Sequence, residues 1–385
     1  MDFDLTDEQR LIQESAKRMV ETRIQPMLDA HSVDDPLPKP AMLEILQACA
    51  ELGMLGGRVA SAIGGSEMQM LDLGLIYEQM PAGALFGVLS QEVTAARIAA
   101  NCSQSQQTKF LEPILDARKI ACTANTEPGA GSDSRALGCQ VTEEVDGYRL
   151  QGRKMWISNI SIADVINVTG VMGADDKGEG DLVRLLVDAE ETPFEAAEIP
   201  TLGLRQAHLG EAVFENALVP AENRLGETGD AAKSLTVTWL GNRCFIALCA
   251  VNMAETALQR ALDYAKERTQ FGKAIAGHQL VQQRLADISA AVTSSRLLCY
   301  YALSRIDAGE RANGVTAMAK RKTLAACEEA ISAAMGVHGS MGLSRELGLE
   351  QLYRDVRMLQ VPDGTNEILA LIEGRELTGT AAFRS

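Results

Sequence analysis

The sequence of 385 residues is poor in aromatic side chains, which make up 4% of it, and it has only four histidines. It also lacks a basic surplus, because 52 acidic residues outnumber 36 lysines and arginines and give a net charge of −16. Nucleic-acid-binding proteins need a basic patch or stripe, and anionic membrane surfaces attract basic segments. The charge therefore argues against both kinds of partner.

Long apolar runs are also lacking, so the sequence predicts no membrane insertion. Residues 1–8 are acidic and contain no apolar core of a signal peptide. The eight cysteines show no C-x-x-C spacing and no pairing with histidines, so we expect no metal site. Scattered thiols in a chain of this size are typical of buried residues in a reducing compartment. We therefore predict a cytoplasmic protein.

The hydrophobic pattern divides the chain into three regions. Thr6–Gln9 forms a capping box, and apolar residues then recur at helical spacing up to residue 117. From residue 230 onward, long alanine-rich segments predict helices that pack as a bundle. Their predicted ranges are 235–268, 278–306 and 315–335.

Between these helical regions, short β-rich runs alternate with turn residues. The predicted strands are 120–124, 139–142, 148–150, 165–171, 182–187 and 212–214. Short strands without intervening helices favour a small antiparallel sheet, a sandwich or a barrel. We therefore predict an α+β multidomain protein, with an N-terminal helical domain (1–117), a middle β domain (118–229) and a C-terminal helical bundle (230–385).

A glycine-rich segment, Thr126–Asp133 (TEPGAGSD), follows the first β-rich run. Its glycines and flanking hydroxyls would let backbone N–H groups approach a flat or anionic ligand. It matches neither the dinucleotide-binding fingerprint nor the P-loop, and an ordinary surface loop is the alternative.

The segment Lys154–Asn159 (KMWISN) contains one of the two tryptophans. Trp156 fits either a buried core indole or an aromatic wall beside a ligand. In the second interpretation, Ser158 offers a hydrogen bond to a ring nitrogen.

Two glycine-containing segments interrupt the C-terminal helices. In the first, Arg268 to Lys273, the basic residues and Gly272 fit a helix C-cap, or Arg268 binds a pyrophosphate. In the second, Gly336 to Gly342, His338 fits a structural histidine or a ligand contact.

Asp363 and Gly364 form an Asp-Gly pair after the arginine-rich segment 353–357. Asp-Gly pairs commonly mark ordinary turns, because Gly supplies positive φ and Asp bonds its own backbone. The alternative is a catalytic carboxylate.

Together these segments resemble the acyl-CoA dehydrogenase flavoprotein family. TEPGAGSD, KMWISN, GLRQA…VFENALVP, ERTQFGKAI…Q, GVHGSMG and YRDVRMLQVPDGTNEI follow one another in the order of that family. The resemblance extends over nearly the whole chain, to Ile368. It implies an N-terminal helical domain, a middle β domain and a C-terminal four-helix domain, assembled into tetramers or dimers.

The resemblance also implies FAD between the β domain and the C-terminal helices. Contacts to the isoalloxazine ring or its ribityl arm are then expected from Thr123, Asn125, Thr126, Gly131, Ser132, Trp156 and Ser158. The ADP half is expected to be held across a subunit boundary by Arg268, Phe271, Gln279, Gly336, Val337, His338 and Gly339. Further cofactor contacts are expected from Thr365 and Glu367. Oligomerisation would then be required for cofactor binding.

The reaction implied is α,β-desaturation of an acyl thioester, carried by CoA or by an acyl carrier protein. Asp363 is expected to remove the α-proton while the β-hydrogen leaves as hydride to the flavin. Ser132, Arg243 and Gly364 are expected to contact the substrate. An electron-transfer flavoprotein is the expected electron acceptor.

Several residues depart from the family pattern. The usual base is Glu after an aromatic residue, whereas this chain has Pro362 and Asp363, with roughly 1.5 Å less reach. A misplacement of that size can cost about 100-fold in rate. A subgroup places its base just before the arginine that corresponds to Arg243, where this chain has Asn242.

Two smaller departures are Ala231-Ala232 in place of Gly-Phe and the absence of the glutamine that commonly opens the Gly336 loop. Two further functions therefore remain open. One is a weakly active or inactive FAD-binding subunit of a heteromer, and the other is a repurposed flavin monooxygenase of the same fold.

Overall fold

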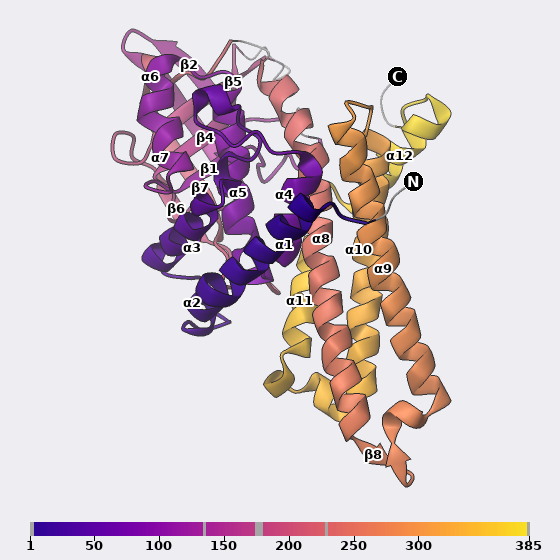
Figure 1. The fold of residues 1–385 in the computed structure, drawn as a ribbon. Helices are drawn as coiled ribbons and strands as arrows, with labels where there is room; N and C mark the ends of the chain where they lie inside the picture. Colours follow the sequence, from indigo (N-terminus) through magenta and orange to yellow (C-terminus); the bar gives the residue numbers. More distant parts are fainter. Residues whose placement is uncertain (1–3, 134–135, 174–179, 228–229, 383–385) are drawn as a thin grey trace.

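Long helices extend as a bundle from a block made of the N-terminal helices and a β-sheet (Figure 1). The computed structural model describes residues 4–133, 136–173, 180–227 and 230–382, with the backbone alone for 231–237. Within these ranges, no helix combines the length and the apolar character that a membrane crossing requires.

The N-terminal region is helical, as predicted. Helix α1 (Asp7–Met19) begins at Thr6, whose hydroxyl accepts from Gln9 N while the Gln9 side chain accepts from Thr6 N, so the capping box is confirmed. The same helical segment continues through the π-helix η1 (Val20–Ile24) into α2 (Gln25–Asp29). The other helices of this region are α3 (Lys39–Glu51), η2 (Met54–Gly56), η3 (Ser61–Ile63), α4 (Met70–Gln79), α5 (Ala82–Ala99), α6 (Gln104–Gln106), η4 (Gln107–Leu111) and α7 (Glu112–Leu115).

A seven-stranded sheet follows, in the order β1-β4-β2-β3-β7-β6, with β5 paired to β4. The strands are β1 (Ala121–Ala124), β2 (Gln140–Glu144), β3 (Gly147–Ser158), β4 (Val165–Met172), β5 (Asp181–Asp188), β6 (Glu195–Glu198) and β7 (Leu209–Pro220). The short helix η5 (Ala221–Asn223) follows β7. Helix α5 lies beside β1, where Gln91 Oε1 accepts from Ala121 N at 2.7 Å.

Most strand pairs are antiparallel, as predicted, but β4 runs parallel to both β1 and β2. β4 is buried along almost its whole length, which is typical of a strand covered on both faces. Apolar alternation does not report the direction of the neighbouring strand, so the sequence could not predict the parallel pairs. β6 was missed because its sequence, EAAE, is fully exposed and has no apolar face.

The C-terminal region contains the predicted long helices. These are α8 (Asp230–Glu267), α9 (Gln279–Asp307) and α10 (Asn313–His338), followed by η7 (Gly339–Leu343), η8 (Arg345–Leu347), α11 (Leu349–Leu359) and α12 (Asn366–Thr378). α8, α9, α10 and α11 run side by side in the bundle (Figure 1).

The helix C-cap interpretation holds for Arg268 but not for Gly272. α8 ends at Glu267, and Arg268 N donates to Tyr264 O at 2.9 Å, whereas Gly272 lies in a turn beyond the helix. β8 (Thr269–Gln270) and β9 (Lys273–Ala274) form a β-hairpin after α8, and η6 (Ile275–Gly277) leads on to α9. Phe271 and Gly272 have φ values of +51° and +80°. Positive φ at both central residues is typical of the two-residue type I′ hairpin turn.

Aromatic packing joins the bundle to the N-terminal helices. Tyr77 of α4 stacks on Phe245 of α8 with ring centroids 4.5 Å apart, and the Arg58 guanidinium lies over the same Phe245 ring. Helix α5 contacts both β1 and α8. One helix therefore connects the sheet to the bundle, and its side chains reach both.

Candidate functional site

Asp363 lies in the turn between α11 and α12. Its φ is +54°, and that of Gly364 is +106°. This left-handed region is uncommon for residues other than glycine, with Asn and Asp the usual exceptions. Asp363 is half-buried, and none of the described residues hydrogen-bonds its carboxylate. The left-handed turn therefore sets the position of the carboxylate, whose oxygens are available to accept a proton.

The turn is held by Lys320 of α10, a residue that the sequence reasoning missed. Lys320 is fully buried, and its Nζ donates to Pro362 O and, at 2.7 Å, to Gly364 O. These two carbonyls flank Asp363, so the lysine fixes the backbone on both sides of the carboxylate. Burial lowers the pKa of Lys320 to about 7, against the opposing effect of Asp363 and with a further lowering by Arg243.

Arg243 of α8 approaches the same turn, as predicted. It is buried, and its Nη1 donates to Asn313 Oδ1 at 2.7 Å. Burial lowers the pKa of Arg243, and the Asp363 carboxylate opposes this effect. Its Nε is buried with no acceptor in the described part of the chain. Asn242 beside it is also buried, and its neutral amide cannot act as a base.

Two more arginines, buried Arg97 and partly buried Arg58, carry their charge near Asp363. Arg58 binds both oxygens of Glu92, with Nε to Oε1 at 2.8 Å, and Arg97 Nη2 donates to Thr238 Oγ1 at 2.9 Å. Burial lowers the pKa of Arg97 to about 10, and the Asp363 carboxylate is the largest opposing influence. Burial opposes the charge of Arg58, but the bound Glu92 raises its pKa, and Asp363 adds a smaller effect in the same direction. The candidate base is therefore coupled to several cationic side chains.

The glycine-rich loop after β1 is anchored by a buried ion pair. Lys154 Nζ of β3 lies 2.7 Å from Glu127 Oε1 and donates to Asn125 O at 2.9 Å. Glu127 also accepts from Gly138 N at 2.6 Å and from Cys139 N at 3.0 Å. These bonds fix the base of the loop, while Gly131 and Ser132 at its tip are exposed.

The structure brings the predicted flavin-ring residues together. Met155 N donates to Thr126 O at 2.9 Å, which joins the tryptophan segment to the glycine-rich loop. Asn125 Oδ1 accepts from Thr169 of β4 at 2.5 Å. Thr123 Oγ1 lies 2.9 Å from Thr94 Oγ1 of α5.

Trp156 is 50% exposed, so its interpretation as a core indole is wrong. The β3–β7 register shifts between Met155 and Ile157, and Trp156 has a φ of +60°. Such β-bulges redirect side chains and are frequent beside active sites. Ser158, two residues on, is half-buried, and its carbonyl accepts from Ser90 Oγ of α5 at 3.3 Å.

In the second glycine-rich segment, Gly336 to Gly342, the two non-glycine residues predicted to contact the cofactor are buried. α10 continues through Gly336 and ends at His338, because Gly339 has a φ of +59°. His338 is buried, its Nδ1 lies 2.8 Å from Ala334 O, and its ring stacks on Tyr264 at 4.5 Å. Val337 is buried as well. Both side chains therefore pack within the chain.

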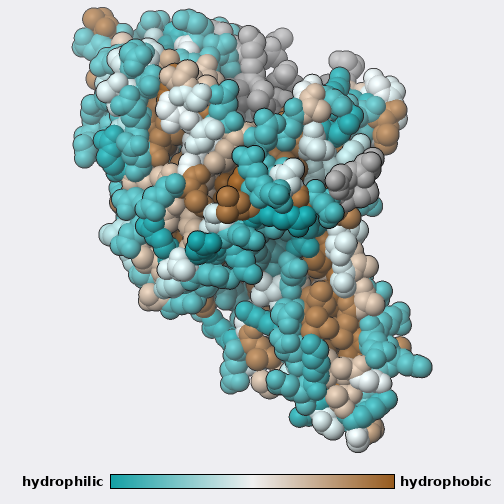
Figure 2. Space-filling model, viewed as in Figure 1, coloured by the Kyte–Doolittle hydropathy of each residue, from teal (hydrophilic) through white to brown (hydrophobic). Residues whose placement is uncertain are grey.

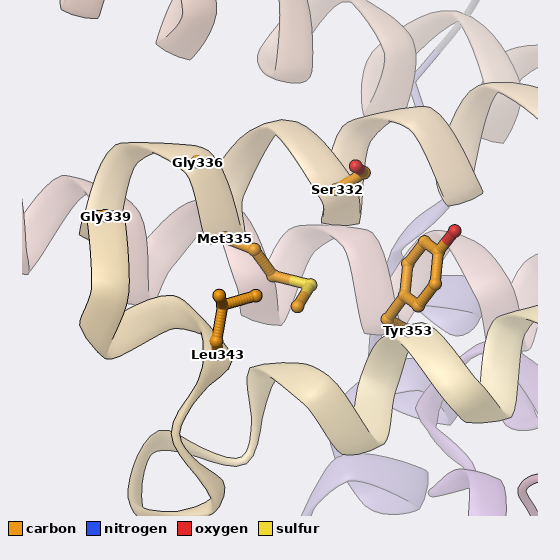
Figure 3. A pocket seen from close by; sticks show the side chains of 6 residues that line it. All are labelled: Ser332, Met335, Gly336, Gly339, Leu343 and Tyr353. Carbon is orange, nitrogen blue, oxygen red and sulfur yellow. The ribbon is translucent and has the colours of Figure 1, made fainter.

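Gly336 and Gly339 instead border a cavity of about 440 Å³ between α10 and α11. Figure 3 shows Met335 of α10 and Tyr353 of α11 directed toward the same space, with Leu343 of η7 beside them. The glycines leave the α10 side of this cavity without a side chain, which provides room for a ligand.

Thr365 and Glu367 lie just after the base turn. The Thr365 hydroxyl caps α12 by accepting from Ile368 N at 3.4 Å. Glu367 is exposed, and a backbone hydrogen bond together with the Thr365 hydroxyl lowers its pKa. In this chain Thr365 thus has a structural task beside its predicted cofactor contact.

Arg268, Phe271 and Gln279 lie at the hairpin end of the bundle, far from the sheet (Figure 1). All three are exposed, Phe271 at 94%. No side chain in the described ranges binds the Arg268 guanidinium. One chain therefore does not bring these residues to the flavin-ring group. The departure at Ala231-Ala232 lies among the side chains outside the described set.

Comparison with known proteins gives one consistent result. The chain matches the family models for the acyl-CoA dehydrogenase N-terminal, middle and C-terminal domains at residues 6–118, 122–217 and 235–378. It is 30% identical over 386 residues to a probable acyl-CoA dehydrogenase, YngJ, of Bacillus subtilis, covering 98% of this chain and 100% of the relative.

The chain belongs to the acyl-CoA dehydrogenase family.

Solved structures agree. Butyryl-CoA dehydrogenase from Megasphaera elsdenii superposes with a TM-score of 0.90 at 28% identity, covering 98% of this chain and 100% of that one. PigA with FAD and proline also gives a TM-score of 0.90 at 28% identity, covering 98% and 99%. The predicted fold and family are confirmed.

As an acyl-CoA dehydrogenase family member, the protein is an FAD-dependent oxidoreductase that acts on CH–CH groups, as predicted. The residues present fit this cofactor. A Cβ added at Gly129 or Gly131 would meet no atom within 4 Å, so the loop backbone borders open space. The exposed Trp156 adjoins the same loop through Met155.

Two motifs of the acyl-CoA dehydrogenase resemblance join the sheet region to α11. Asp355 Oδ1 accepts from Leu204 N at 2.6 Å, and a Cβ at Gly203 would lie 2.6 Å from the Arg354 backbone. The close approach therefore requires glycine. Burial raises the pKa of Asp355 to about 6.

The functional residues that sequence reasoning missed are buried cations. Arg97 and Lys320 both lie in alanine-rich helices, at buried positions. A charged residue on the apolar face of a helix is the signal that would have found them, because such residues are rarely buried without a partner.

Proposed function

We propose that this protein removes hydrogen from the α and β carbons of an acyl-CoA thioester, with Asp363 as the base that takes the α-proton. The observation that carries the proposal is the half-buried Asp363 carboxylate, free of hydrogen bonds from the described residues, in a turn fixed on both sides by Lys320. A general base needs an available lone pair and a fixed position. This turn provides both.

Bound FAD would supply the acceptor for the hydride that leaves the β-carbon. The chain itself positions the thioester and receives the α-proton at the Asp363 carboxylate. The backbone N–H of Asp363 has no acceptor among the described residues, so it can donate to the thioester oxygen. Arg243 keeps its positive charge beside the turn, which favours the negative charge that proton removal creates on the substrate.

We also propose that two copies of the chain complete each cofactor site. The predicted flavin-ring residues lie on the sheet and its adjoining loop, whereas Arg268, Phe271 and Gln279 lie at the distant end of the bundle (Figure 1). The bundle exposes the apolar side chains of Leu280, Leu297 and Tyr301, and Figure 2 shows hydrophobic surface along the bundle. A homodimer or homotetramer would cover such surface and bring the hairpin of one copy to the sheet of another.

CoA is the proposed carrier of the acyl group, and an electron-transfer flavoprotein is the proposed acceptor of the electrons. Membership in the acyl-CoA dehydrogenase family supports the first, and a relative that is a caffeyl-CoA reductase-Etf complex subunit, CarC of Acetobacterium woodii, supports the second. An acyl-carrier-protein thioester would enter by the same route and is the matched comparison in any substrate panel.

The test is anaerobic reduction of the bound flavin by a panel of acyl-CoA thioesters. Wild-type protein should lose its oxidised-flavin absorbance, and Asp363→Ala should be slower by about 10²–10⁴-fold, the usual contribution of a general base. FAD content and circular dichroism of the variant control for folding. Unchanged reduction by Asp363→Ala would show that the base is another group.

Asp363→Glu is the matched variant that restores the carboxylate of the usual length. It should retain or raise the rate if the pocket is only a shortened version of the usual one. Absence of reduction by every thioester in the wild-type protein, with FAD bound, would refute the dehydrogenase proposal and favour an inactive subunit.

A further inference from the structure

One face of α5 borders open space, although most of the helix is enclosed. In residues 82–95 every side chain is buried except those at Gly83, Phe86 and Ser90, which are half-buried positions. Their spacing of three and four residues places them on one side of the helix. Phe86 is the one large side chain of these three positions, so its ring is the main obstacle along this face.

The accessible face of α5 leads away from the predicted flavin-ring residues toward Phe86. Ser90 Oγ donates to Ser158 O at 3.3 Å. Thr94 Oγ1, one turn farther along α5, lies 2.9 Å from Thr123 Oγ1. Phe86 precedes Ser90 by four residues, which corresponds to about 6 Å along the helix. Phe86 therefore lies about one turn beyond the flavin-ring residues.

The proposed base lies toward the opposite end of α5. Burial lowers the pKa of Arg97, and the Asp363 carboxylate is the largest opposing influence, so the base is near the end of the helix that carries Arg97. In the proposed reaction the α-carbon faces Asp363 and the β-carbon faces the flavin. An acyl chain that passes from the base to the flavin therefore continues along α5 toward Phe86.

The end of α5 near Arg97 suits the carrier of the acyl group. A cavity of about 470 Å³ lies there, and Arg58, Arg97 and Thr238 are among its lining residues. Two alanines of its wall, Ala60 and Ala100, are exposed. CoA and the acyl carrier protein both carry phosphate groups on the thioester arm, so a polar and accessible space is the expected path for either.

Helix α8, which packs on α5, is closed on the acyl side. Each of the eight residues from Cys244 to Val251 is 0% exposed. Cys249 Sγ donates to Met80 O at 3.4 Å, and Asn252 Nδ2 donates to Glu78 O at 2.7 Å. Helix α4 therefore covers this part of α8, and no water-sized gap borders these eight residues into which a long acyl chain could extend.

The turn of α5 that carries Phe86 is held in place. Asn159 Nδ2 donates to Gly87 O at 2.9 Å, which ties this turn to the segment of the flavin-ring residues. A Cβ at Gly83 would lie 2.7 Å from Gln206 Oε1, so Gln206 covers the same helix face just beyond Phe86. The ring therefore stands at the end of the accessible face.

We propose that Phe86 closes the acyl end of the site, so that the preferred substrates are thioesters of short acyl chains. An extended carbon chain advances about 1.2 Å per bond, so about five bonds span the roughly 6 Å between the levels of Ser90 and Phe86. The ring itself occupies part of this length. Butyryl and hexanoyl groups therefore fit, whereas longer chains meet the ring. This inference rests on the proposed dehydrogenase function and names its substrate class.

The test compares the CoA thioesters of butyric, hexanoic, octanoic and dodecanoic acids. The wild-type protein should favour the better of the two short thioesters over dodecanoyl-CoA by at least about tenfold in kcat/KM, because one methylene in an apolar site changes specificity by about 10–200-fold. Phe86→Ala should raise the octanoyl-to-butyryl ratio of kcat/KM by at least about tenfold. Phe86→Trp, which enlarges the obstacle, should lower the hexanoyl-to-butyryl ratio.

Phe194→Ala is the matched control, because it truncates another half-buried phenylalanine, one that packs on the core of the sheet. It should leave the order of chain lengths unchanged. Equal kcat/KM for butyryl-CoA and dodecanoyl-CoA in the wild-type protein would overturn the proposal. So would a folded Phe86→Ala variant that slows all chain lengths alike, because that result indicates a structural role. If Phe86→Ala does not fold, an unchanged hexanoyl-to-butyryl ratio in Phe86→Trp overturns the proposal instead.

Binding distinguishes the failure of this inference from that of the proposed function. The FAD-loaded Asp363→Ala protein should bind butyryl-CoA at least about tenfold more tightly than octanoyl-CoA by calorimetry, and addition of Phe86→Ala should remove the difference. If no thioester reduces the wild-type flavin but this difference persists, the dehydrogenase proposal fails and the limit on chain length stands. If all chain lengths reduce the flavin equally well, the reverse holds. If neither reduction nor the binding difference is observed, both fail.

Discussion

The base turn and the hairpin at the end of the bundle are both short, glycine-containing turns with positive φ, but they differ in their surroundings. In the base turn, buried Lys320 holds the carbonyls on both sides of Asp363. In the hairpin, Phe271 is 94% exposed, and its ring lies edge-on to that of His278 with the ring centroids 6.1 Å apart. One chain therefore holds the proposed base in position, but its hairpin does not reach the predicted flavin-ring residues of the same chain. The proposed base is thus held by a single chain, whereas the proposed cofactor contact of the hairpin requires a second copy.

The largest effect on the reaction is expected from breaking the base turn. Lys320→Met removes both anchors of the turn, and a displacement of about 1 Å lowers a rate by about 100-fold. We therefore expect flavin reduction by the best thioester to slow by about 100-fold while FAD content stays unchanged. Stopped-flow absorbance measures the rate. Lys322→Met, which removes an exposed lysine of the same helix, is the control, and equal rates for the two variants would contradict the anchoring role.

A smaller effect is expected from altering the hairpin. Arg268→Ala removes the guanidinium proposed to bind the FAD pyrophosphate in a neighbouring copy, and a hydrogen bond to a charged group contributes about 1.5–3 kcal/mol. The affinity for FAD should fall by about tenfold or more, measured by titration of apoprotein. Lys266→Ala, at the exposed end of α8, is the control. Unchanged FAD affinity in Arg268→Ala would place the ADP half elsewhere.

The smallest effect on the reaction is expected at Asp355, which ties α11 to Leu204. Burial raises the folded-state pKa of Asp355 from 3.8 to about 6, so the folded protein holds this proton more tightly than the unfolded chain. The contribution of Asp355 to stability is therefore greatest below about pH 4 and declines as the pH rises to 6.

Asp355→Asn keeps an acceptor for Leu204 N but cannot ionise. As the pH rises from 4 to 7, the unfolding free energy of Asp355→Asn should increase by about 1–3 kcal/mol relative to that of the wild-type protein, since one pKa unit corresponds to about 1.4 kcal/mol. Urea unfolding at the two pH values measures the difference. The same shift with pH in both proteins would assign the titration to another group.

The sequence predicted what depends on neighbours along the chain. Helical periodicity located the long helices, the capping box at Thr6 located the start of α1, and the order of the motifs identified the family. Local patterns do not specify partners distant in sequence. Lys320 meets its carbonyl acceptors 42 and 44 residues away, and β4 pairs in parallel with strands on either side of it.

Residue type was also misleading where the backbone is irregular. The bulge at Trp156 turns this side chain toward solvent, although its size is typical of a residue buried in a hydrophobic core. Asp355 and Gly203, which look like parts of functional motifs, hold α11 against the sheet region. The cofactor and substrate contacts of individual residues, and the limits of the three domains, stay predictions.

Lys320 binds the main-chain oxygens of Pro362 and Gly364. These oxygens do not depend on which side chain residue 363 carries. The proposed base is therefore a side chain that can be exchanged without loss of the contacts that hold the turn. The positive φ at position 363 favours Asp, Asn and Gly, so single-codon changes among Asp, Asn and Gly can remove or restore a carboxylate while the turn persists. Such changes would remove or restore the proposed chemistry without altering the fold.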